Sequence, residues 1–513
     1  MAKSDSPLRV SRSASEQAGV LVLGKILATL SEAVVPLVIV RLLGKADVGI
    51  LSGLLLVYST VALVLTAGFP ETLTFYLPTR APEERKAIAS KVAQALLLLG
   101  LLGALVLLAI SLLARFAPSW ASSMASGHDQ SGVESLKYLA LLAVYPIADL
   151  PGRMLPNLLI VEQRAKAAAG IGIVKAIGSA VAAILPIALG APLWVVILSI
   201  GSFGFLFGAV LVYYIRRLYP GVPAIESPIS MRTLLRFGLP LGLTDIVSML
   251  NNQLDRYLIV FFFPVTAVAE YQAGAWQIPI IMTIPYTVGA VYAPRFVELF
   301  KAGQSQEAIG IWRQSALKSA LLVVPITMVF VVASEETMEL LFTKSYLRAA
   351  PVFRWYCILT LGRIATFGSV ILAAGAPRLI FQAAVVSLVS NALLCSVLVK
   401  VVGFNGPAMG TALAFIPSVA YYCVCIAAAT KLKFRQIFPL FGFLRVLGLT
   451  CVASLPAWWF KSAVSWSAAV RLPVEAGLVL GTFALLGTLA GTIQRPDWTF
   501  LVNWLRLRML RES

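Results

Sequence analysis

The sequence predicts an all-α polytopic membrane protein with about 14 transmembrane helices, arranged as two six-helix lobes plus two C-terminal helices. Of its 513 residues, 59% are hydrophobic and 12% are charged, whereas soluble domains average about 45–50% apolar and about 25% charged residues. The apolar residues form runs of about 20, the length that a helix needs to cross a bilayer. The two halves of the chain also resemble each other, which predicts an internal repeat.

Each predicted helix is one of these apolar runs. Their ranges are 18–42, 47–78, 89–116, 136–161, 167–189, 192–215, 237–263, 266–298, 309–333, 350–374, 378–401, 406–430, 440–463 and 471–492. The two long runs, 47–78 and 266–298, contain prolines, so we expect bends within them.

The repeat sets the predicted domains. The loop that leads to Gly53 has a counterpart that leads to Gly274, and the loop that ends at Arg164 has one that ends at Arg378. Repeats of this kind hold a substrate site at their interface near the middle of the bilayer. The predicted parts are an N-terminal lobe, a cytoplasmic linker, a C-terminal lobe, two additional transmembrane helices and an interfacial cytoplasmic tail, at 1–215, 216–236, 237–430, 431–492 and 493–513.

The formal net charge of +18 comes mostly from Lys and Arg in short loops between the apolar runs. This pattern is typical of cytoplasmic loops and does not favour a nucleic-acid partner. The loops on the N-terminal side hold more of these cations, so both termini are predicted to be cytoplasmic.

Cysteine and histidine usage gives no sign of a metal centre. All five cysteines fall inside predicted spans of the second half, and the single His128 lies in a polar loop. Neither shows metal-ligand spacing, and no hydrolase constellation is visible. We therefore expect no metal and no enzymatic activity.

A polar run at the middle of one predicted span, residues 251–256 (NNQLDR), is the strongest functional signal. An Arg or Asp at this depth costs about 2.5–3.5 kcal/mol even on lenient scales, so the run requires a protein-lined or water-filled interior. Helical spacing places Asp245, Asn252 and Arg256 on one face, and Asn251 and Asp255 on an adjacent face. These groups either line a cavity or form a packing network in which they satisfy one another.

Lysines, an arginine and a glutamate lie inside other predicted spans. Lys25 and Glu32 are seven residues apart on the first span and therefore share a face. Lys175 either lines the interior or reaches the inner membrane surface. Arg363 lies near the middle of its span, too deep for its side chain to reach the membrane surface, so it is a candidate cavity cation.

Asp149 and Arg153 are four residues apart on one predicted helix, and the repeat makes Arg363 the counterpart of Asp149. The two neighbours either neutralise each other or contribute to the interior. Glu270, Trp276 and Gln277, at the start of another span, suit a sugar, although a tryptophan there also suits a membrane-interface anchor.

Over roughly residues 18–430 the chain resembles the polysaccharide-flippase (Wzx-type) branch of the multidrug/oligosaccharidyl-lipid/polysaccharide exporter superfamily. The segments that carry the resemblance are 38–49 (VIVRLLGKADVG), 68–71 (GFPE), 76–78 (YLP), 254–256 (LDR), 270–271 (EY) and 405–412 (NGPAMGTA). The resemblance implies two six-helix lobes around a central cavity with alternating access. It also implies C-terminal helices that form a groove for a lipid tail, as in the lipid II flippase branch.

The implied substrate is a polyprenyl-diphosphate-linked oligosaccharide, moved from the inner to the outer leaflet of a bacterial inner membrane during cell-surface polysaccharide biosynthesis. The implied protein is a monomer that can associate with polysaccharide polymerase machinery, and H⁺ or Na⁺ is a possible coupling ion. Cations in a low-dielectric cavity suit a diphosphate. The candidate phosphate ligands are Lys25, Lys175, Arg256 and Arg363, the candidate counter-charges or coupling groups are Glu32, Asp245 and Asp255, and the candidate polar lining is Asn251, Asn252, Glu270, Trp276 and Gln277.

Two other functions are weighed against this one. A cation-coupled multidrug exporter of the same superfamily should carry more acids than bases inside the membrane, whereas here the deep charges lean basic. A membrane oligosaccharide polymerase or ligase should present a large outer loop with catalytic groups, and the longest predicted outer loop, about 117–136, offers few.

Overall fold

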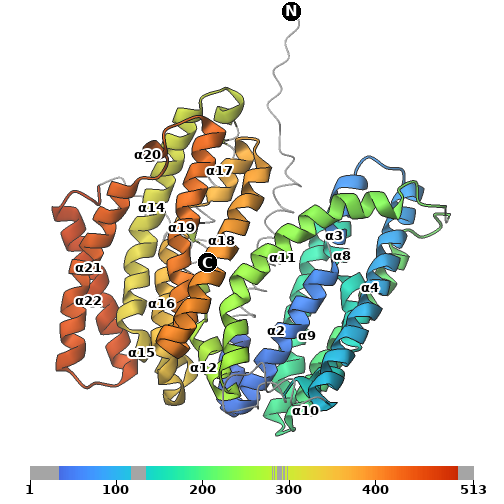
Figure 1. Cartoon of the computed structure of the whole chain (residues 1–513), viewed down its shortest axis with the longest axis horizontal. Coiled ribbons are helices and arrows are strands. Elements are labelled where there is room, and N and C mark those ends of the chain that lie inside the picture. Colours follow the sequence, from blue (N-terminus) through green and yellow to red (C-terminus); the bar gives the residue numbers. More distant parts are fainter. Residues whose placement is uncertain are drawn as a thin grey trace, which may run out of the picture. The chain divides into compact units, whose positions relative to one another are not determined.

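The computed structural model describes residues 34–116 and 135–494, except for 67, 224, 280, 282–283, 286–291, 293–294 and 297. Every regular element in these residues is a helix (Figure 1), which confirms the predicted fold class. Nine helical stretches of this part of the chain are long and apolar enough to cross a membrane, and one of them, 378–430, contains two helices. The protein is therefore a multi-pass membrane protein.

The chain folds into two compact units. The described residues up to Met249, together with Val260–Ala269, form the first unit. Its helices are α2 (Lys45–Thr66), α3 (Phe69–Tyr76), α4 (Pro82–Phe116), η1 (Ser135–Leu142), α7 (Tyr145–Gly152), α8 (Leu155–Val161), α9 (Ala165–Ala188) and α10 (Leu193–Arg217). Its core is aliphatic and includes Leu54, Leu73, Ile88 and Leu150, which are fully buried.

Leu250–Ile259 and the described residues from Glu270 onward form the second unit, so α11 (Met231–Phe262) and α12 (Val265–Gly274) contribute to both. The remaining helices are α14 (Ser305–Val332), α15 (Ser334–Phe342), η2 (Lys344–Ala349), α16 (Ala350–Leu361), α17 (Phe367–Ala373), α18 (Pro377–Val402), η3 (Gly403–Asn405), α19 (Gly406–Thr430), α20 (Phe434–Ile437), α21 (Leu440–Ala463) and α22 (Ala468–Leu489). The predicted domain boundaries stay predictions.

The order of elements repeats along the chain. Two short helices and two long ones follow one another as α7–α8–α9–α10 and again as α16–α17–α18–α19. Sequence reasoning predicted one continuous span for each short pair, at 136–161 and 350–374, and this was wrong. In the first pair, Pro151 and Pro156 lack the N–H that a continuous helix needs, which explains the interruption.

A second interruption separates α2 from α3 inside the predicted long span 47–78. Gly68 adopts φ 70°, a left-handed conformation that disfavours any side chain. A Cβ there would also lie 2.2 Å from the carbonyl oxygen of Gly238. The expected bend is confirmed, and its cause is a glycine as well as the neighbouring Pro70.

The two C-terminal helices, α21 and α22, pack together and against α14 within the second unit. Val329 and Val332 of α14 share an apolar cluster with Ala457 of α21 and Val479 of α22. Figure 1 shows this α21–α22 pair as a hairpin beside α14. The hairpin is therefore attached to the body by a buried apolar contact.

Close helix packing gives a first testable prediction. A Cβ on Gly410 of α19 would lie 2.7 Å from Cys395 Sγ and 2.8 Å from the backbone of α18, whereas a Cβ on Gly481 of α22 meets no described atom within 4 Å. We expect Gly410→Ala to lower the free energy of unfolding by about 1–3 kcal/mol. Gly481→Ala should leave it unchanged or raise it by up to about 1 kcal/mol through helix propensity. Thermal unfolding in detergent measures both, and equal effects would contradict the packing argument.

Candidate functional site

A buried carboxylate in the first unit is held by two cations and a tyrosine. Tyr58 of α2 donates its hydroxyl to Asp149 Oδ2 at 2.7 Å. Arg153 donates to the same oxygen from Nε at 2.9 Å and from Nη2 at 2.8 Å, and Lys175 Nζ of α9 lies 3.4 Å from Oδ1. Tyr145 stacks on Tyr58 with ring centroids 4.5 Å apart. These five residues are called the Asp149 cluster.

The Asp149 cluster carries a surplus of one positive charge, because two cations share one carboxylate. Asp149 itself is 5% exposed, and a carboxylate at that depth needs ionic partners. The side chains of Arg153 and Lys175 are 28% and 46% exposed. The predicted pairing of Asp149 with Arg153 is confirmed, and Lys175 joins it. The cluster can therefore present cations to a ligand while their counter-charge stays buried.

A second buried carboxylate lies in the second unit. Asp255 of α11 is 1% exposed. It accepts hydrogen bonds from the hydroxyl of Tyr271 at 2.7 Å and from that of Tyr356 of α16. Arg256 donates its backbone N–H to Asp255 Oδ1 at 2.9 Å, and its guanidinium bonds to Tyr356. These four residues are called the Asp255 cluster.

Both clusters contain one aspartate, two tyrosines and an arginine close to the aspartate in sequence, and the Asp149 cluster adds Lys175. Tyr145 and Tyr356 also come from α7 and α16, which occupy the same place in the repeated order of elements. The carboxylates differ in origin, since Asp149 belongs to α7 and Asp255 to α11. The repeat therefore reproduces the chemistry of the cluster without reproducing each position.

A chain of uncharged polar groups joins α11 to α18 and α19. Asn251 donates to Ser387 Oγ at 3.1 Å, and Asn391 donates to the backbone and side-chain oxygens of Asn251 at 2.7 and 3.2 Å. Thr411 donates to Asn391 Oδ1 at 3.2 Å. The packing interpretation of the polar run thus holds for Asn251, whose amide has protein partners on both sides.

Other predicted site residues lie along the second unit. Arg363 donates to Gln277 Oε1 at 3.4 Å, so the structure brings these two together. Glu270 is buried, with Arg348 3.7 Å from its carboxylate. Trp276 packs edge-to-face on a neighbouring phenylalanine, as an apolar contact would.

Some predicted residues are not brought together. Asp245 is exposed and belongs to the first unit, and Asn252 is exposed. The face that they were expected to share with Arg256 therefore stays a prediction. Lys25 and Glu32 lie outside the described residues.

Sequence reasoning missed the four tyrosines of the two clusters. A buried tyrosine hydroxyl needs a hydrogen-bond partner, so a tyrosine within an apolar span was the available signal. Asn391, a single amide in an apolar helix, was missed as well.

A third charged group attaches the α21–α22 hairpin and is called the hairpin network. Its members are Glu335, Glu336, Arg354, Lys461, Arg471 and Glu475. Glu336 is 3% exposed and lies 2.7 Å from both Lys461 Nζ and Arg471 Nη2. One carboxylate of α15 therefore holds a cation from each helix of the hairpin.

We expect Glu336→Gln to lower the free energy of unfolding by about 2 kcal/mol, less than the about 3–5 kcal/mol of a buried charge left uncompensated. The variant removes the nearest carboxylate of two largely buried cations and leaves Lys461 only Glu335 at 3.4 Å and Arg471 only Glu475 at 3.7 Å among the described residues. The matched control is Glu339→Gln on the same helix, whose ion pair with Lys344 spans 3.6 Å and is largely exposed. Glu339→Gln should lower the free energy of unfolding by less than about 1 kcal/mol. Denaturation of the detergent-solubilised variants compares them, and similar losses would argue against the network as the attachment.

Comparison with known proteins places this arrangement in a family. A family model described as "Polysaccharide biosynthesis protein" matches residues 15–300, more than half of the chain. The chain belongs to this family. A curated relative, "Probable low-salt glycan biosynthesis flippase Agl15" of Haloferax volcanii, is 24% identical to this chain over 212 residues. That match covers 40% of the chain and 44% of the relative, so the chain spans less than half of the relative's length.

Solved structures show that this member of the polysaccharide biosynthesis protein family has a transporter fold. The lipid II flippase MurJ, in an inward closed conformation, matches with a TM-score of 0.67 and 13% identity, over 91% of this chain and 98% of that one. A transporter of the MOP superfamily from Pyrococcus furiosus matches with a TM-score of 0.53 and 15% identity, over 82% and 96%. At these identities the likeness concerns the fold. Family and fold together confirm the resemblance drawn from the sequence.

Proposed function

We propose that the protein is a flippase that moves a polyprenyl-diphosphate-linked oligosaccharide from the inner to the outer leaflet of a bacterial inner membrane by alternating access. It acts in cell-surface polysaccharide biosynthesis, as a monomer associated with polymerase machinery, and both termini are cytoplasmic. Membership of the polysaccharide biosynthesis protein family supports the pathway. The fold shared with a lipid II flippase supports a lipid-linked cargo.

The observation that carries the proposal is the surplus cation of the Asp149 cluster. Lys175 Nζ lies 3.4 Å from the carboxylate and its side chain is 46% exposed, so it can turn to a ligand at small cost. When Lys175 turns to the ligand, Arg153 still neutralises the Asp149 carboxylate. A diphosphate is the part of the proposed substrate that needs such a cation.

The second unit has two cations of its own that suit a phosphate. Arg256 Nε is buried and has no hydrogen-bond partner among the described residues. A buried donor without an acceptor costs about 1–3 kcal/mol, which a phosphate oxygen would recover. Arg363 donates to Gln277 at 3.4 Å, so this second cation lies beside a polar group that suits a sugar. We assign Arg256 and Arg363 to the phosphates and Gln277 to the first sugar.

Either ion coupling or the membrane potential can drive the transport cycle, and for ion coupling we propose H⁺ or Na⁺. Asp255 is the proposed coupling group in the described part of the chain, because its carboxylate is buried and its partners are mainly hydroxyls. Asp245 and Glu32 are the other proposed acids.

The test is reconstitution of the purified protein into liposomes that hold a fluorescent polyprenyl-diphosphate trisaccharide. A membrane-impermeant quencher or glycosidase reports how much of the glycan lies in the outer leaflet. We expect protein-dependent movement that a pH or Na⁺ gradient accelerates. Absence of movement, with export of cationic dyes by cells that make the protein, would support the multidrug-exporter alternative. Elongation of the glycan would support a polymerase.

A further inference from the structure

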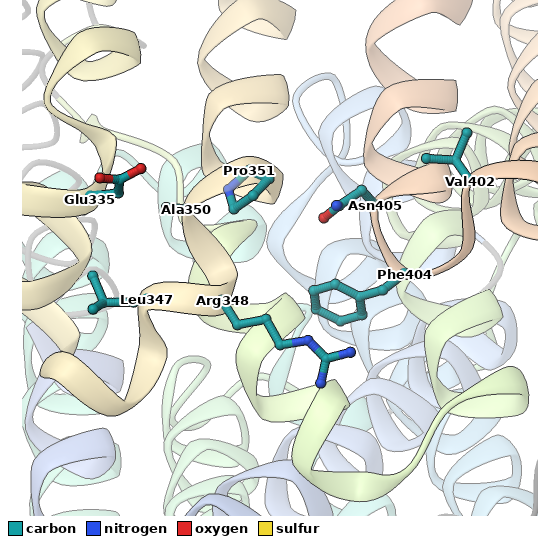
Figure 2. Close-up of a pocket in the computed structure, with 8 residues that line it drawn as sticks. All are labelled: Glu335, Leu347, Arg348, Ala350, Pro351, Val402, Phe404 and Asn405. Atoms are coloured by element: carbon teal, nitrogen blue, oxygen red, sulfur yellow. The ribbon is translucent and has the colours of Figure 1, made fainter. Parts of the chain in front are cut away.

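The second unit has a pocket of about 530 Å³ that shares no residue with the Asp255 cluster. The start of α15, η2, the start of α16 and the turn between α18 and α19 form it, as Figure 2 shows. It is called the Asn405 pocket. Its lining residues are Glu335, Leu347, Arg348, Ala350, Pro351, Val402, Phe404 and Asn405.

Two side chains of this pocket, Asn405 and Glu335, offer oxygen atoms that can accept hydrogen bonds from a ligand. Asn405 Oδ1 is buried and accepts no hydrogen bond within the described residues, and an unsatisfied buried acceptor calls for a donor. Glu335 is oriented by Arg354 at 2.8 Å and Lys461 at 3.4 Å. Burial alone would raise the pKa of Glu335, but these cations lower it below its ordinary value. Glu335 is therefore ionised at neutral pH, and its remaining lone pairs can accept hydroxyl protons.

One donor group completes the polar side. The Arg348 side chain is 67% exposed, and its guanidinium lies 3.7 Å from Glu270 and 5.2 Å from the Phe404 ring centroid. An exposed ion pair of this length contributes little, so Arg348 can turn towards a ligand. In Figure 2 the Arg348, Asn405 and Phe404 side chains approach one another across the pocket.

The other wall is apolar and suits the C–H face of a ring. It consists of Leu347, Pro351, Val402 and Phe404. Apolar walls with a few fixed polar groups are typical of small-molecule sites, and the volume lies within their usual range of about 300–1,000 Å³. A ring with one apolar face and several hydroxyl donors satisfies both walls at once.

The charges exclude other ligand classes. A phosphate would meet the Glu335 carboxylate with only one cation, Arg348, to hold it. A cation would meet Arg348 itself, and the other carboxylate nearby, Glu270, already faces that guanidinium. A neutral, polyhydroxylated ring avoids both conflicts.

We propose that the Asn405 pocket is a saccharide-binding site that takes about one or two neutral sugar rings of a glycan. Binding by itself does not depend on transport. The use of this site during glycan transport, as a hold for the sugar end of the lipid-linked substrate, rests on the proposed function.

The experiment uses the full-length protein in nanodiscs and a printed array of defined, lipid-free neutral mono- to tetrasaccharides. The saccharide bound best is then titrated against wild type and variants. Leu347→Trp fills the pocket, Asn405→Leu removes its buried acceptor, and Arg348→Gln replaces its charged guanidinium donors with a shorter neutral amide. Leu393→Trp is the control for bulk, because Leu393 lies on α18 outside the pocket and is 64% exposed. Unfolding temperatures verify that each variant is folded.

We expect at least one saccharide to bind, with an affinity about tenfold weaker in each of the three pocket variants and unchanged in Leu393→Trp. Absence of binding on the whole array would overturn the site, as would equal affinity of wild type and the folded pocket variants. The flippase test separates the two proposals. Saccharide binding without lipid-linked transport would support the saccharide site and contradict the flippase proposal. Transport without saccharide binding would support the flippase proposal and contradict the saccharide site.

Discussion

The Asp149→Asn variant is expected to unfold with a free energy about 2–3 kcal/mol below that of the wild type. Asparagine keeps the shape of aspartate but removes the one carboxylate that pairs with Arg153 and Lys175 in the described part of the chain. Breaking a fully buried pair costs about 3–5 kcal/mol. The lower figure applies here because the two cations are 28% and 46% exposed. Reversible denaturation of the protein in detergent measures the difference.

Two further variants make this result specific to the Asp149 cluster. Glu84→Gln is the matched control, because Arg80 and Glu84 form an ion pair at the same i, i+4 spacing and on a more exposed surface. It should cost less than about 1 kcal/mol. Adding Arg153→Gln to Asp149→Asn should restore part of the lost stability, as a coupled pair requires. Strictly additive losses would show that the carboxylate does not hold the cations.

The Arg256→Gln variant is expected to lose at least about tenfold of its transport rate while reaching normal abundance in the membrane. Glutamine cannot supply the charge that a diphosphate needs. Arg256→Lys keeps the charge but not the forked geometry of the guanidinium, so its rate should stay well below that of the wild type. Arg363→Ala should behave like Arg256→Gln. Flipping of the fluorescent trisaccharide lipid in liposomes measures all three.

The control for these variants is Arg295→Gln. Arg295 is an exposed cation of the same unit that pairs with Glu298 at 3.1 Å, so its loss should leave transport unchanged. Wild-type rates in both Arg256→Gln and Arg363→Ala would remove these residues from the substrate site. A fall in abundance that accounts for the whole loss of rate would assign them to stability.

Much of the fold could be predicted because it follows from composition and local pattern. Runs of about 20 apolar residues cannot remain in water, and in a bilayer each must close its own backbone hydrogen bonds as a helix. This predicted α9 and α10 within two residues of their bounds, and the end but not the start of α4. The broken spans at α7–α8 and α16–α17 were missed, because hydropathy measures apolar length and ignores where the backbone turns.

The candidate site was predictable only in part, for a related reason. Placing a charged side chain deep in the bilayer costs free energy at any position, so Asp255, Arg256 and Lys175 stood out from the sequence. The residues that pair with them did not stand out. Tyr356 lies 101 residues from Asp255 along the chain, and nothing in its own neighbourhood marks it as a ligand of that carboxylate.

The sequence by itself determined that the protein crosses the membrane many times, repeats its architecture, and buries charges that need an enclosed interior. These are properties of single segments, set by the cost of exposing polar groups to hydrocarbon. Only the tertiary structure decided which charges neutralise one another and which retain a surplus. It placed two cations on Asp149, two tyrosines on Asp255 and an unpartnered oxygen of Asn405 in a pocket. Pairing depends on distances between segments far apart in the chain, and those distances exist only after the helices have packed.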